Sequence, residues 1–198
     1  MLGTYDFCGY YEMTFQWLED LGGKALVREY WIDGISRDSQ RHARALILPG
    51  GFSGMMEYWG HTLLEESPNL GYSMHKGENM LRADMQDCPS KGFLDRNGLH
   101  QYSDYCDHCI GWIGPLMKDA GFVVDHEHNH CGQCWWEFRK ADNPEAPTKP
   151  GEVYEKDARL MSAWTLPGVK IDRFRRATDV EDKVAAPEQP PGSAGSTA

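Results

Sequence analysis

The sequence predicts an α+β fold in which helices cover a small antiparallel sheet built from two β-hairpins. Three observations lead to this class. Helical spacing of apolar residues dominates the first half of the chain, two alternating stretches each surround a turn, and a long amphipathic segment lies between them. Strands and helices do not alternate regularly, which disfavours a parallel doubly wound sheet. The predicted order is helices, hairpin, helix, hairpin, and then an extended C-terminal tail.

The N-terminal part is expected to form helices separated by glycines. Gly22-Gly23, Gly34 and Pro49-Gly50-Gly51 supply the breaks, because glycine and proline both end helices. The expected helices are residues 10–21, 24–32 and 52–66, whereas residues 41–48 fit either a helix or a strand.

Two hairpins are expected where residues alternate around turn sequences. The first turns at Lys76-Gly77-Glu78 and its second strand stops at Cys88-Pro89, because proline has no N–H to donate. The second closes near residues 129–132. The expected strands are residues 70–75, 79–86, 122–130 and 133–139.

The most regular helical pattern lies in residues 103–120. Ser103 or Asp104 is a suitable N-cap, and Gly121 is a suitable C′ residue just after the helix. Pro115 removes one backbone hydrogen bond and bends the helix axis. One broad face is apolar and contains Tyr105, Cys106, Cys109, Ile110, Trp112, Ile113, Leu116 and Met117. The polar side contains Asp104, Asp107, His108, Lys118 and Asp119.

The chain is expected to hold one domain, residues 1–142, followed by a Pro-rich tail, residues 143–198. That composition cannot order itself alone, and about the last 15 residues are expected to be disordered. Apolar residues within the tail predict that part of it docks on the domain or on a partner subunit, so a homo-oligomer formed through the tail is a candidate assembly. These residues are Trp164, Leu166, Val169, Ile171 and Phe174.

Composition argues against two classes of partner. A formal net charge of −10 disfavours nucleic acid, and no apolar run approaches the roughly 18 residues that a membrane-spanning helix needs. The opening residues lack the basic and apolar regions of a secretion signal, so a cytoplasmic location is expected. In that reducing setting the six cysteines are expected to be thiols, metal ligands or catalysts.

Cysteine and histidine gather in one stretch of the chain. Five of the six cysteines and five of the eight histidines fall between positions 88 and 134. Thiolate and imidazole side by side suit nucleophilic catalysis or the binding of a soft metal. The residues are Cys88, Cys106, Cys109, Cys131, Cys134, His100, His108, His126, His128 and His130.

Two Cys-x-x-Cys pairs make a metal site a candidate. Cys106-x-x-Cys109 and Cys131-x-x-Cys134 are separated by 21 residues, close to the spacing of four-cysteine zinc sites. The first pair, however, opens a helix instead of a tight knuckle. The candidate cofactor is a divalent transition metal, zinc or iron, and no nucleotide cofactor is expected. The candidate metal ligands are His126, His128, His130, Cys106, Cys109 and Cys134.

Three histidines alternate in the last predicted hairpin. On a strand, residues two apart share a face, so His126, His128 and His130 are expected to point inward. Buried imidazoles need partners, which metal ligation or an acid-base site supplies. The alternative is that the strand ends near Asp125 and all three reach solvent.

Cys106 is the candidate nucleophile, because the N–H groups and dipole of a first helical turn lower the pKa of a thiol. His108, on the polar side of the same helix, is either a surface histidine or a group that reaches substrate at the helix mouth. Cys109, on the apolar face, is more typical of a small core residue. Tyr105, Trp112 and Trp136 are candidate substrate contacts or core aromatics.

The order of these motifs resembles the L-2-amino-thiazoline-4-carboxylate hydrolase family over about residues 10 to 140. The motifs are Cys88-Pro89, Tyr105-Cys106-Asp107-His108-Cys109, Gly121-Phe122 and Gly132-Gln133-Cys134-Trp135-Trp136-Glu137-Phe138. The resemblance implies the opening of a small cyclic amidine that bears a carboxylate, with Cys88, Cys106 or Cys109, and Cys134 in the family's marked positions. Cys131, the three alternating histidines and the long tail depart from that pattern, which leaves the substrate open.

Taken together, the residues and the resemblance predict a hydrolase that acts on a carbon–nitrogen bond of a small heterocyclic or aromatic acid. In one version Cys106 attacks and a histidine from the His126 to His130 strand relays the proton, and the candidate catalytic residues are Cys106, His108 and His128. In the other version, a metal held by His126, His128 and His130 activates water. Two alternatives stay open. One is a metal-dependent lyase or oxidoreductase on an aromatic acid, and the other is a zinc-stabilised module that binds a protein partner.

Overall fold

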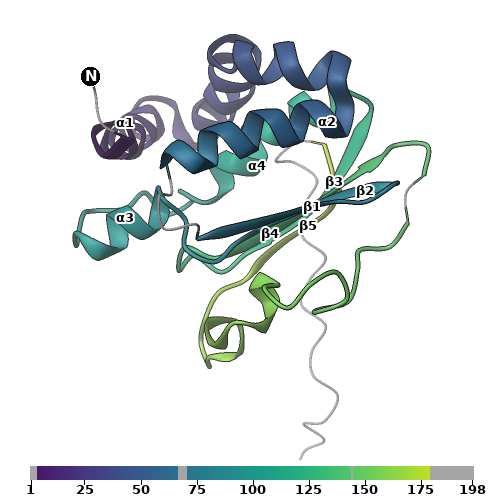
Figure 1. The fold of residues 1–198 in the computed structure, drawn as a ribbon. Helices are drawn as coiled ribbons and strands as arrows, with labels where there is room; N and C mark the ends of the chain where they lie inside the picture. The colour runs from purple at the N-terminus through teal and green to yellow at the C-terminus, as the bar shows by residue number, and fades with distance from the viewer. Residues whose placement is uncertain (1–3, 67–70, 144, 179–198) are drawn as a thin grey trace, which may run out of the picture.

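The computed structural model describes residues 4–66, 71–143 and 145–178, which confirm the predicted α+β class (Figure 1). These residues form a five-stranded antiparallel sheet in the order β1-β2-β4-β3-β5, with the long helices on one face. The strands are β1 (Tyr72–Lys76), β2 (Met80–Met85), β3 (Phe122–His128), β4 (Cys134–Lys140) and β5 (Asp172–Ala177). The helices are α1 (Thr4–Glu29), the π-helix η1 (Tyr30–Ser39), α2 (Arg41–Glu66), α3 (Lys91–Arg96), α4 (Asp107–Asp119) and the 3-10 helices η2 (Ala158–Leu160) and η3 (Ser162–Thr165).

Both predicted hairpins are present. Strand β1 pairs with β2, and β3 pairs with β4, each antiparallel. Strands β2 and β4 then join the two hairpins into one sheet. The strands β3 and β4 differ from the prediction mainly in length, because β3 ends at His128 and leaves His130 in the turn.

The fifth strand comes from the segment that the sequence assigns to the tail. Strand β5 pairs with β3 at the edge of the sheet, with Asp172 opposite His128. Phe174 fills the core, whereas Arg173 and Arg175 lie on the other face. The sequence did not predict this strand, because its alternation is carried by charged residues. Residues 179–198, including those expected to be disordered, lie outside the described ranges.

Glycines bend the N-terminal helices at two of the predicted breaks. The helical path is interrupted at Gly23 (φ 70°) and Gly51 (φ 54°), positive values that favour glycine. Residues 41–48 are helical, which settles that ambiguity. The predicted stop at Gly34 is wrong, because the chain continues there as the π-helix η1.

The two faces of the sheet differ in chemistry because side chains alternate along each strand. The face under α2 and α4 carries apolar residues such as Leu81, Val124 and Phe138, all buried. The opposite face carries charged residues and is covered by the segment containing η2 and η3 (Figure 1). No helix in the described ranges is both long and apolar enough to cross a lipid bilayer.

A buried ionic cluster joins that covering segment to the sheet. Arg82, with no exposed side-chain surface, contacts Asp84 at 2.6 Å, Glu137 at 2.9 Å and Asp157 at 3.0 Å. Its guanidinium also lies 4.5 Å from the ring centre of Trp135. Because each charge has partners, the cluster can stabilise the segment without leaving an unpaired buried ion.

Candidate functional site

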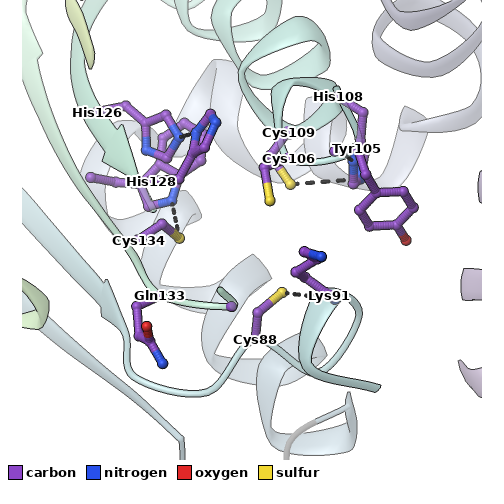
Figure 2. Close-up of a pocket in the computed structure, with 12 residues that line it drawn as sticks. Cys88, Lys91, Tyr105, Cys106, His108, Cys109, His126, His128, Gln133 and Cys134 are labelled. Atoms are coloured by element: carbon purple, nitrogen blue, oxygen red, sulfur yellow. Dashed lines mark hydrogen bonds between the residues drawn. The ribbon is translucent and has the colours of Figure 1, made fainter. Parts of the chain in front are cut away.

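Four cysteines from three parts of the chain surround one small cavity, called here the thiol chamber. Figure 2 shows the sulfur atoms of Cys88, Cys106, Cys109 and Cys134 around a common open space. The chamber has a volume of about 30 Å³. Cys131 is exposed and does not line the chamber. The two Cys-x-x-Cys pairs suggested Cys131 as the fourth cysteine of the site, whereas the chamber contains Cys88 instead.

Local backbone contacts hold these cysteines in place. Cys106 occupies the N-cap position of α4 without a side-chain capping hydrogen bond, and Cys109 lies in the first turn of that helix. Cys134 begins β4. The backbone N–H of Cys88 donates to the carbonyl of Gly132 at 2.8 Å, so the loop after β2 is tied to the turn between β3 and β4.

A larger cavity of about 210 Å³, called here the aromatic cavity, adjoins the thiol chamber between the helices and the sheet. The two cavities share the lining residues Cys88, His108, Cys109, Cys134 and Trp136. Of the three candidate substrate contacts, Trp112 lines the aromatic cavity, Tyr105 lines the thiol chamber and Trp136 lines both. A planar molecule in the larger cavity would therefore meet thiols at one end.

His108 is buried, contrary to the expectation from its position on the polar side of the helix. Its ring packs against Phe15 and Tyr105, with ring centres 5.4 and 4.9 Å away. Helix α1 covers this side of α4, which periodicity within α4 alone does not reveal. Burial lowers the pKa of His108 to about 4, although the carbonyl of Tyr105 opposes this shift.

The two ring nitrogens of His108 have different partners. Nδ1 lies 2.5 Å from the carbonyl oxygen of Tyr105, and Nε2 lies 3.6 Å from the sulfur of Cys109. A carbonyl oxygen only accepts, so Nδ1 carries the proton of the neutral ring and Nε2 presents its lone pair to the thiol. Cys109, His108 and the Tyr105 carbonyl are thus placed as a thiol, a base and an orienting group would be in nucleophilic catalysis.

The pKa of Cys106 moves opposite to the expected direction. Burial raises it well above its usual value, and the neighbouring thiols of Cys88 and Cys134 add to the shift. Burial also raises the pKa of Cys88 and of Cys134. The effect of the helix N-terminus is outweighed by desolvation, so Cys106 is not activated in the way the sequence suggested.

The four sulfurs lie too far apart to ligate one metal ion without moving. Among the described residues, no three of them have sulfur atoms within 4.8 Å of one another. One zinc ion with bonds of about 2.3 Å to its sulfur ligands would have to draw them together. Two sulfurs already accept N–H hydrogen bonds, Cys88 from the backbone of Lys91 at 3.4 Å and Cys134 from the indole of Trp136 at 3.3 Å.

His126 and His128 point into the core as expected, but His130 does not share their strand. His126 and His128 are 1% and 2% exposed, whereas His130 follows the end of β3 with φ 56°. Both nitrogens of His126 are engaged, Nδ1 with the carbonyl of Trp135 at 2.7 Å and Nε2 with Nδ1 of His128 at 3.0 Å. His126 therefore supports His128 and offers no free nitrogen.

The remaining nitrogen of His128 faces two carboxylates that the sequence did not suggest. Nε2 lies 3.1 Å from Asp107 and 3.7 Å from Asp172. Burial opposes a charge on this ring, but the two carboxylates outweigh it and raise the pKa of His128. Asp172 lies 44 residues beyond His128, in a strand that only the fold identifies.

Lys91 is a further residue that the sequence did not single out. It lies in the short helix α3, lines the thiol chamber and is buried, and its ammonium donates to Asp95 at 3.0 Å (Figure 2). It places a positive charge beside the thiols, where the acid group of a substrate could bind.

No family model, no curated protein and no solved structure matches this chain.

Proposed function

We propose that the protein is a hydrolase that opens a carbon–nitrogen bond in a small planar organic acid, with Cys109 as the nucleophile and His108 as the general base. The observation that carries this proposal is the approach of His108 Nε2 to the Cys109 sulfur at 3.6 Å, on a wall shared by the thiol chamber and the aromatic cavity. Cys109 replaces Cys106 in the role that the sequence suggested.

The protonation state of His108 suits this role. Its lowered pKa keeps the ring neutral, so Nε2 is free to accept the thiol proton. A low pKa also makes a weak base in the empty site. The negative charge of a bound acid would favour the imidazolium form and raise that pKa, which couples substrate binding to activation of Cys109.

In the proposed reaction the Cys109 sulfur bonds to the amidine carbon while the thiol proton passes to His108 Nε2. The carbon–nitrogen bond then breaks, and the leaving nitrogen takes that proton. A water molecule adds to the carbon and gives a proton to Nε2. The carbon–sulfur bond breaks last, and Cys109 regains its proton, so one water molecule has been added across the broken bond.

The two cavities indicate the shape of the substrate. The aromatic cavity accepts a flat, largely apolar ring, because rings such as Trp59, Trp112 and Trp136 line it. Among the described residues that line it, none is a lysine or an arginine. The acid group would instead lie in the thiol chamber, beside Lys91.

Replacing Lys91 by methionine is expected to raise KM for such an acid at least about tenfold, with a smaller change in kcat, because a charge-assisted contact to the carboxylate is lost. Steady-state kinetics with the acid and with its neutral amide measure the effect. The amide should be handled equally by both proteins. An unchanged KM for the acid would remove Lys91 from the binding site.

The pH dependence of kcat/KM gives a second test. A base with an ordinary histidine pKa of 6.5 would lose about tenfold in activity between pH 7.5 and 5.5. Because the pKa of His108 is lowered to about 4, the neutral form persists at pH 5.5, and kcat/KM is expected to stay within about twofold there. A tenfold fall by pH 5.5 would assign the base to another group.

The proposal is tested by screening small cyclic amidines and heterocyclic acids, including 2-amino-thiazoline-4-carboxylate, for ring opening by mass spectrometry. Turnover by the wild type and by Cys131→Ser, whose thiol is exposed and outside the chamber, would support it. Absence of turnover across the panel would count against it.

A second candidate is a metal centre held by thiolates in the thiol chamber. The convergence of four buried cysteine side chains favours it, since binding a metal removes the thiol protons that burial otherwise retains. Metal analysis of the protein as purified separates the two. A stoichiometric metal that is lost in Cys134→Ser but retained in Cys131→Ser would favour the metal centre over the free nucleophile.

A further inference from the structure

Pairing of β3 with β5 brings three potential ligands to one edge of the sheet. His128 ends β3 and faces Asp172, the first residue of β5. His130 follows in a left-handed conformation that turns its ring back, and its Nε2 lies 2.6 Å from the Asp172 carboxylate. The ligand atoms of His128, His130 and Asp172 all lie within 4.8 Å of one another.

The hydrogen bonds of the neighbouring rings determine where the protons lie. His126 donates from Nδ1 to the carbonyl of Trp135, so its Nε2 can only accept from Nδ1–H of His128. A neutral His128 then has a bare lone pair on Nε2, which is buried and makes no aligned hydrogen bond within the described part of the chain. Oδ1 of Asp107, 3.1 Å from that nitrogen, is likewise buried and makes no aligned hydrogen bond among the described residues.

A lone pair facing two carboxylates is unfavourable unless a cation lies between them. That cation is either a proton on Nε2 or a metal ion. Two imidazoles and one carboxylate are the ligands that divalent first-row transition metals such as zinc and iron accept, and they leave further coordination positions open. We infer that His128, His130 and Asp172 bind one divalent transition-metal ion, at a site that shares His128 with the wall of the thiol chamber but uses none of its thiols.

The surroundings support His128 as a ligand. Metal-bound histidines donate their other N–H to a fixed acceptor, and here Nδ1–H of His128 donates to His126, which the Trp135 carbonyl holds in turn. The side chains of His130 and Asp172 are 18% and 16% exposed, so an ion can enter from solvent.

Lys170 competes for the same carboxylate. Its ammonium lies 2.6 Å from Asp172, and its side chain is 60% exposed. A metal ion must displace this ammonium from the carboxylate or share the carboxylate with it, which costs affinity. Lys170 therefore offers a variant that should strengthen binding while touching no buried part of the fold.

Calorimetric titration of the metal-free full chain with Zn²⁺ alone tests the site. The wild type is expected to bind one Zn²⁺ ion at a site of higher affinity than any other site on the chain. Asp172→Asn and His130→Gln are expected to bind this ion at least about tenfold more weakly, and Lys170→Ala several-fold more tightly. His75→Gln, at an exposed histidine on β1, should match the wild type. Lack of binding by the wild type, or equal binding by Asp172→Asn, would overturn the inference and leave His128 as an imidazolium.

The absorption spectrum of the Co²⁺ complex separates this site from a thiolate centre. Ligation by imidazole and carboxylate gives weak bands, whereas cysteine ligands add intense charge-transfer bands. The expected result is a spectrum without such bands, unchanged in Cys106→Ser. An intense band that Cys106→Ser removes would place the ion on the thiols of the chamber and contradict the assignment. Failure of the hydrolase proposal would alter neither measurement, so the metal site and the hydrolase activity are tested independently.

Discussion

Replacing Cys109 by serine is expected to lower kcat/KM at least about a thousandfold for any small cyclic amidine acid that the protein opens. Serine keeps the size and the hydrogen bond to His108, but a neutral hydroxyl is a far weaker nucleophile than a thiol beside a base. Its fold should be unchanged, since the substitution removes no packing beyond the difference between sulfur and oxygen. Steady-state kinetics and circular dichroism check both expectations.

Cys106→Ser is the matched comparison, because both thiols belong to the N-terminal end of α4 and line the same chamber. Within residues 4–66, 71–143 and 145–178, no histidine is hydrogen-bonded to Cys106 as His108 is to Cys109, and burial holds the pKa of Cys106 high. It is expected to retain activity within about tenfold. Loss of activity in Cys106→Ser with retention in Cys109→Ser would reverse the assignment and restore the nucleophile that helix position alone suggested.

Replacing Arg82 by methionine is expected to lower the free energy of unfolding by about 3–5 kcal/mol, because it leaves Asp84, Glu137 and Asp157 buried without their shared cation. Urea unfolding measures the change. Arg96→Met is the control, since Arg96 and Asp87 form an exposed pair, each side chain 53% exposed, which should contribute at most about 1 kcal/mol. Equal effects in the two variants would contradict the stabilising role of Arg82 in the buried cluster.

The pH dependence of stability should reveal the same cluster. Burial alone would raise the pKa of Glu137 and of Asp157, yet hydrogen-bond donors and Arg82 hold both below their ordinary values. Carboxylates with lowered pKa stabilise the fold above their unfolded pKa, and this contribution is lost as the pH falls. The ordinary pKa values of these groups are 4.5 and 3.8, so the wild type should lose stability as the pH falls below about 5, and Arg82→Met should lose less over that range.

Local patterns predicted most of the elements. Alternation identified both hairpins, helical spacing identified α4 and the N-terminal helices, and glycines at positions 23 and 51 marked real bends. The predictions failed where tertiary contacts decide. The π-helix continues past Gly34, and β5 is recognisable only once β3 presents an edge for it.

The fold brings together many of the cysteines and histidines that the sequence singled out, but their surroundings differ from those expected. The stretch from Cys88 to Cys134 does line the thiol chamber, with Cys131 outside it. Periodicity within α4 assigned His108 to a polar face, because it contains no information about the covering helix α1. It likewise could not reveal that desolvation outweighs the helix N-terminus at Cys106, or that Asp172 returns to face His128.

The most direct test of the proposed chemistry is to trap the covalent intermediate. A cyclic amidine acid that the protein turns over is mixed with it, the reaction is quenched within a single turnover, and the modified peptide is sequenced by mass spectrometry. The expected result is an adduct on Cys109, absent in Cys109→Ser and longer-lived in His108→Asn. An adduct on Cys106, or turnover that leaves every thiol unmodified, would contradict the assignment of Cys109 and His108.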